Sequence, residues 1–86
     1  MNKILVDSLN DTNNVVKLGA RRFPGIIIQG DTLHVLLSDI KRSKLEFNNL
    51  NHEEGEWLLD DVISRLEHMK QLYEEALDNN GIMKPY

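Results

Sequence analysis

The apolar residues in the first thirty positions occur in short runs that are separated by turn-forming residues. Such runs, rich in β-branched residues and bounded by Asn, Asp, Gly and Pro, predict short strands at about residues 3–7, 15–18 and 25–29. The third segment is the clearest, because its three consecutive isoleucines suit a strand that is covered on both faces, or one that is covered by helices on one face and by a partner on the other. A small antiparallel sheet of two or three strands is the simplest assembly of these segments.

The pattern changes to a helical period after residues 30–32, which read Gly-Asp-Thr. Glycine permits a tight turn, and a side-chain oxygen of Asp31 or Thr32 can accept hydrogen bonds from the first helical turn. Apolar residues then recur three and four positions apart, at Leu33, Leu36, Leu37 and Ile40. This spacing predicts a helix over about 32–43 whose apolar stripe lies on the sheet.

A second, longer helix is predicted over about 53–78, with Asn51 as its cap and Asn79-Asn80-Gly81 as its end. Its apolar residues follow alternating steps of three and four, at Leu59, Val62, Leu66, Met69, Tyr73 and Ala76. This face is larger than a small sheet and one short helix cover, so part of it is predicted to pack against a second copy or another protein. The alternative is a helix that lies across its own sheet.

Length and composition restrict the class of protein. The 86 residues predict a single domain, 1–86, with a core thin enough that oligomerisation adds stability. The chain has no cysteine, which excludes disulfides and thiolate chemistry and favours a reducing cytoplasm. No apolar run approaches the roughly 20 residues that a membrane span needs, so we expect a cytoplasmic protein that does not span a membrane.

The formal charge of −4 is unevenly distributed. Residues 1–50 carry seven Lys and Arg against five Asp and Glu, whereas residues 51–86 carry three against nine. The basic residues form two candidate patches, Arg21 and Arg22, and Lys41, Arg42 and Lys44. Because nucleic-acid binding rests on a concentrated cationic face with interleaved aromatics, this distribution favours protein partners over nucleic acid.

No residue pattern indicates catalysis or a cofactor. No glutamate precedes His34, His52 or His68 by three residues, the spacing that helical metal sites commonly use. The acidic run at the start of the second helix consists of Glu53, Glu56, Asp60 and Asp61. Acids near a helix N-terminus stabilise it, so a solvated acidic face is favoured over a pair of catalytic carboxylates. The sequence therefore predicts a protein that is not an enzyme and needs no metal or cofactor.

Residues 24–33 read Pro-Gly-Ile-Ile-Ile-Gln-Gly-Asp-Thr-Leu and resemble the HicB-type antitoxin fold family. The resemblance implies a small sheet with a helix across it, although the first helical turns differ and a long acidic helix stands where a DNA-binding segment would follow. Residues 15–43 are similar to small uncharacterised bacterial proteins that share Arg-Arg-Phe-Pro-Gly and then Gln-Gly-Asp, a domain of unknown function. That likeness implies a bacterial origin and a fold but no activity.

These observations favour an α+β domain that binds proteins without catalysis, self-associates as a homodimer through its C-terminal helix, and has an antitoxin- or immunity-like role. The predicted interface consists of Trp57, Leu59, Val62, Leu66, Met69 and Tyr73. The acidic face would add charge complementarity to a basic protein partner. The alternative is a nucleic-acid-binding regulator that uses the two basic patches, with binding that falls steeply with salt.

Overall fold

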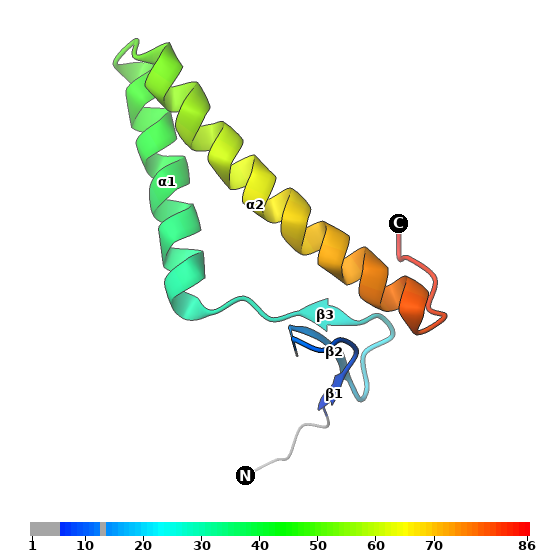
Figure 1. Cartoon of the computed structure of the whole chain (residues 1–86). Helices are drawn as coiled ribbons and strands as arrows, with labels where there is room; N and C mark the ends of the chain where they lie inside the picture. Colours follow the sequence, from blue (N-terminus) through cyan, green and yellow to red (C-terminus); the bar gives the residue numbers. More distant parts are fainter. Residues whose placement is uncertain (1–5, 13) are drawn as a thin grey trace. The chain divides into compact units, whose positions relative to one another are not determined.

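The computed structural model describes residues 6–12 and 14–86 and has the predicted α+β class, a three-stranded antiparallel sheet followed by two helices (Figure 1). The elements are β1 (Val6–Ser8), β2 (Val15–Leu18), β3 (Gly25–Ile26), α1 (Gly30–Asn48) and α2 (His52–Asn79). The chain divides into two compact units. The sheet unit holds the described residues up to Ile27 together with Met69–Tyr86, and the hairpin unit is Ile28–His68. Whether the units make one domain, as the sequence predicts, stays a prediction.

The sheet has the order β1-β2-β3, and both neighbouring pairs are antiparallel. Val6 pairs with Leu18 at one end of the first pair, and Val15 pairs with Ile26 in the second. Within the described residues the first strand covers Val6–Ser8, so it continues one residue past its predicted end at residue 7. Residues 3–5 of the predicted strand lie outside the described residues. The second strand has the predicted bounds.

The third strand is shorter than predicted, since it ends at Ile26 and not at residue 29. The Ile27 amide still donates to the Asn14 carbonyl, at 2.7 Å, but the Ile27 side chain is exposed. The Ile27 side chain is 51% exposed, so it is not covered on both faces within one copy of the chain, and cover by a partner on one face stays a prediction.

The core of the sheet unit joins β2 to the last turns of α2. Val15, Ala76 and Leu77 are buried together, and Leu9, Tyr73 and Ile82 pack around them. Two long-range hydrogen bonds strengthen this contact, from the Tyr73 hydroxyl to the Pro24 carbonyl at 3.1 Å and from Asn80 Nδ2 to the Leu9 carbonyl at 3.0 Å. The end of α2 therefore packs within the unit that holds the sheet, as the sequence-based alternative proposed.

The predicted stop of α2 at residues 79–81 is confirmed. Gly81 has φ +67°, and the Ile82 and Gly81 amides donate to the Leu77 and Asp78 carbonyls at 2.9 and 3.2 Å. These two bonds form a Schellman motif, which needs the left-handed conformation that glycine adopts without strain. Because Ile82 also packs against Leu77, the motif folds the C-terminal segment onto the core.

The first helix is longer than the predicted 32–43, because it begins at Gly30 and ends at Asn48. Its end has the same two bonds as that of α2, from Asn51 to the Glu46 carbonyl and from Leu50 to the Phe47 carbonyl, at 2.8 and 3.1 Å. Here Leu50 has φ +61°, a conformation that costs a residue with a side chain about 1 kcal/mol. The prediction placed the end at about residue 43, whereas Leu45 and Phe47 still lie within the helix.

Candidate protein-binding surface on the helical hairpin

The hairpin unit is held together by a close contact near the connection between its helices. Ser43 of α1 is buried, and its Oγ donates to the Gly55 carbonyl of α2 at 2.8 Å. A Cβ atom on Gly55 would lie 3.1 Å from the Phe47 ring. Glycine at this position therefore lets the two helices approach closely, and Leu36, Leu58 and Val62 are buried further along them.

Exposed apolar residues lie beside these buried positions on both helices. They are Leu33, Leu37 and Ile40 on α1 and Leu59, Ile63 and Leu66 on α2, and their exposed fractions lie between 37% and 57%. Successive residues of an α-helix are rotated by about 100° around the helix axis. Viewed down each axis, the centre of the exposed row lies roughly 75° around from the centre of the buried positions, in the direction in which the residue numbers increase. The two helices run in opposite directions from their connection and diverge away from it (Figure 1). In helices that run in opposite directions, this rotation turns both rows toward the same side. We call these six residues the apolar side.

Charged residues occupy the other side of the hairpin. Arg42 lies 4.0 Å from both Asp39 on its own helix and Glu54 on α2, and Arg65 lies 3.1 Å from Asp61. Around each helix axis, these charged residues lie on the opposite side of the buried positions from the apolar rows. The Arg42–Glu54 pair connects the two helices on that charged side. The ion pairs of the hairpin therefore lie on the side opposite the apolar side, although that side also carries the exposed residues Val35 and Trp57.

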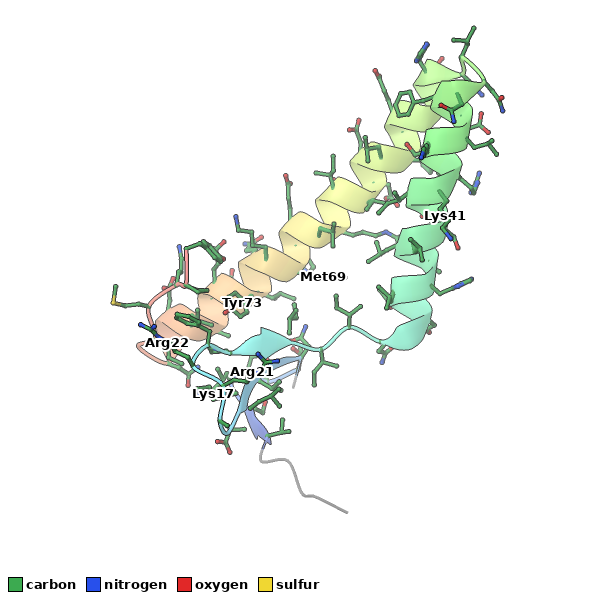
Figure 2. The ribbon with its side chains drawn as sticks, turned by 180° about the vertical axis from the view of Figure 1, so that it is seen from behind. Lys17, Arg21, Arg22, Lys41, Met69 and Tyr73 are labelled. Atoms are coloured by element: carbon green, nitrogen blue, oxygen red, sulfur yellow. The ribbon has the colours of Figure 1, made fainter. Side chains whose placement is uncertain are left out.

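The residues of the predicted interface are not all on one surface. Leu59 and Leu66 belong to the apolar side, whereas Trp57 is 64% exposed and lies beside a shallow depression at the start of α2 with Asn51, Glu53 and Glu54. Val62 is buried inside the hairpin unit, and Tyr73 packs in the core of the sheet unit. Met69 is half-buried on α2 (Figure 2).

Sequence reasoning missed four of the six residues of the apolar side. It predicted that Leu33, Leu37 and Ile40 lie on the sheet, but these side chains are exposed, and α1 belongs to the hairpin unit. It also left Ile63 out of the interface. Short connections favour antiparallel neighbours, and the structure has only three residues between α1 and α2. The predicted helices left about nine residues between them, so this signal would have appeared only if the end of the first helix had been placed correctly.

The acidic and basic candidates are mostly exposed. Glu53, Glu56 and Asp60 are exposed on α2, while Asp61 pairs with Arg65. The basic residues divide between the units, with Arg21 and Arg22 in the sheet unit and Lys41, Arg42 and Lys44 in the hairpin unit (Figure 2). The Arg22 guanidinium lies 5.1 Å from the centre of the Phe23 ring, and the Lys17 ammonium donates to the Arg21 carbonyl.

Within residues 6–12 and 14–86, no group of three or more His, Asp and Glu side chains is arranged to hold a metal ion. His52 packs its ring 5.8 Å from that of Phe47, at the connection between the helices. No helix in this part of the chain has the length and apolar character that crossing a membrane requires.

An ion pair and a cation–π contact hold the C-terminal segment against α2. Lys84 Nζ lies 3.0 Å from Glu74 Oε2, and the Lys70 ammonium lies 5.2 Å from the centre of the Tyr86 ring. The hydrogen bond from Lys84 holds the pKa of Glu74 below its ordinary value of 4.5, and the same bond raises the pKa of Lys84 above 10.5. The pairing is solvent-exposed, so its contribution to global stability is small.

We expect the contact between Lys84 and Glu74 to be lost at low pH and again at high pH. A lowered carboxyl pKa means that the contact is complete above pH 4.5 and is lost as the pH falls through the lower, folded value. The raised pKa of Lys84 implies a second loss as the pH rises past 10.5. The amide chemical shifts of residues 83–86, followed by NMR from pH 7 to 2, should report the acidic transition. In Lys84→Ala, Glu74 should titrate at a higher pH; an unchanged pKa would contradict the assignment.

The geometry defines an α+β protein that joins a small antiparallel sheet to a two-sided helical hairpin. The chain belongs to a family of unknown function, DUF6959, whose model matches residues 1–86. This agrees with the expectation of an uncharacterised domain. No curated protein and no solved structure matches the chain.

Proposed function

We propose that this protein is a non-catalytic protein-binding module that binds through the apolar side of its hairpin. The observation that supports the proposal is the coincidence of two exposed apolar rows on one side of one structural unit, opposite a side that carries ion pairs. Isolated exposed leucines are ordinary on protein surfaces, but contiguous apolar patches are typical of interaction sites.

The magnitude of the hydrophobic effect favours an apolar partner. Fully burying one leucine or isoleucine side chain contributes about 1.5–3 kcal/mol, so covering a half-exposed one contributes about 1 kcal/mol. Six such residues supply about 6 kcal/mol, which barely offsets the cost of about 4–15 kcal/mol for association. A partner that brings an apolar face of its own about doubles the gain, whereas a polar partner does not.

The other hypotheses rest on weaker support. Nucleic-acid binding would need the basic residues free, yet Arg42 lies between Asp39 and Glu54 and the five basic candidates divide between two units. A basic protein partner, an antitoxin- or immunity-like role and a cytoplasmic location stay predictions from the sequence.

The proposal is tested by capture with matched baits. Leu37→Asp with Leu66→Asp places two charges on the apolar side, and Trp57→Asp places one on an exposed residue outside it. The tagged wild type and Trp57→Asp should each retain the same protein from a nuclease-treated lysate of the source organism, whether another protein or untagged copies of this chain. The double variant should retain at least tenfold less of it.

Circular dichroism of all three baits provides the folding control, because exposed positions should tolerate the changes with an unchanged helical signal. Equal retention by the double variant and the wild type, or no specific retention by either, would overturn the proposed function.

A further inference from the structure

We infer that the occupant of the apolar side is a second copy of the chain, with α1 of each copy lying on α2 of the other in an antiparallel four-helix bundle. The inference rests on the proposed function and names its partner. It adds a specific pairing of helices, which two charged edges of the hairpin determine.

The size of the surface suits a dimer. Helices of 17–19 residues are about 25–30 Å long and about 10 Å wide, so one side of the hairpin covers roughly 500–600 Å² in projection. A stable interface buries about 800 Å² of accessible surface per partner. The two areas are of the same order, because protruding side chains make the accessible surface of a helix larger than its projected area. A second copy brings an identical apolar surface, which is the kind of partner that the hydrophobic argument requires.

The edges of the apolar side carry opposite charges. Lys41 is exposed beside the α1 row of the apolar side, and Lys44 is exposed in line with that row, at its end nearest the connection between the helices. We call these two residues the basic edge. The acidic edge of α2 consists of Glu53, Glu56 and Asp60, all exposed. Neither set takes part in an ion pair among the described residues, in contrast to Arg42 and Arg65 on the other side.

The two edges also lie at the same level along the hairpin. Ser43 contacts Gly55, so in antiparallel helices Lys41 lies level with Trp57 and Lys44 with Glu54. In a dimer whose two-fold axis runs along the hairpin, each residue keeps its position along that axis in both copies. The same axis places α1 of one copy on α2 of the other. The basic edge of each copy then lies beside the acidic edge of its partner, twice in the dimer.

The other symmetric arrangement, with the axis across the helices, places α1 on α1 and α2 on α2. It brings basic edge to basic edge and acidic edge to acidic edge, and like charges across an interface oppose association. Charge therefore selects the arrangement in which the edges are complementary.

Charge reversal tests this pairing on the full chain. Lys41→Glu with Lys44→Glu gives a first variant that is acidic on both edges, and Glu56→Lys with Asp60→Lys gives a second that is basic on both. Measured by sedimentation equilibrium of purified protein at low salt, the wild type should be a dimer. Each variant alone should dissociate at least tenfold more readily, and an equimolar mixture should recover dimers of one variant with the other.

Two matched controls carry the same change in net charge at exposed positions outside the edges. Arg21→Glu with Arg22→Glu matches the first variant, and Asp11→Lys with Glu75→Lys matches the second; both should dimerise as the wild type does. If either edge variant dimerised as tightly as its control, the pairing of α1 with α2 would be wrong.

A monomeric wild type would overturn the inference outright. The proposed function would still stand if the capture experiment retained a different protein through the apolar side, and would fail with it if nothing were retained. The two outcomes are therefore distinguishable.

Discussion

Replacing Leu77 by alanine is expected to lower the free energy of unfolding by about 3 kcal/mol, within the range of 2–5 kcal/mol for such changes in protein cores. Leu77 is fully buried between Val15 and Ala76, and it is also the residue whose carbonyl accepts the Ile82 amide at the end of α2. Few other side chains fill the core of this small unit, so the cavity has little opportunity to collapse.

Urea denaturation followed by circular dichroism measures the loss, and amide exchange of β2 locates it in the sheet unit. Asp78→Ala, at the exposed neighbouring position, should change the stability by less than about 0.5 kcal/mol. A Leu77→Ala protein that loses less than about 1 kcal/mol would show that α2 does not hold the sheet in place.

Replacing Gly55 by leucine is expected to be the most disruptive change in the hairpin. Removing a glycine from a helix interior gains about 1 kcal/mol. Even a Cβ at this position lies 3.1 Å from the Phe47 ring, however, and the remaining atoms of leucine must displace that ring or separate the helices. Overpacking costs about 1–3 kcal/mol, and separation would also break the Ser43 hydrogen bond to Gly55, so a net loss of about 2 kcal/mol is expected.

Fluorescence of Trp57, the single tryptophan of the chain, reports this region because it lies two residues from the substitution. Ser64→Leu adds the same side chain at an exposed position of α2 and should leave the stability nearly unchanged. A Gly55→Leu protein as stable as Ser64→Leu would contradict the close approach of the two helices.

The fold class was predictable because each element carries its own local pattern. The stop at residues 79–81 was predicted from glycine chemistry, and the Schellman bonds of Gly81 confirm it. The end of α1 was not predictable in the same way, because its left-handed position holds Leu50 rather than glycine. Local rules identify a helix end only where the residue that they expect is present.

The apolar side was only partly predictable, for a different reason. Periodicity shows which residues share a face of one helix, but not which element that face meets. The α1 stripe was therefore assigned to the sheet, and Val62 to an interface, although a buried contact between Ser43 and Gly55 pairs the helices with each other. A serine and a glycine carry no apolar signal, so this contact was not visible in the pattern.

The most direct test of the apolar side uses the absence of cysteine from the chain, because one introduced thiol is then the only one present. Leu37→Cys places it on the apolar side, and Trp57→Cys places it on an exposed residue elsewhere. The rate of maleimide labelling should fall at least fivefold for Leu37→Cys between nanomolar and high micromolar protein, and should stay constant for Trp57→Cys. Equal, concentration-independent rates for the two thiols would contradict an apolar side that a second copy covers.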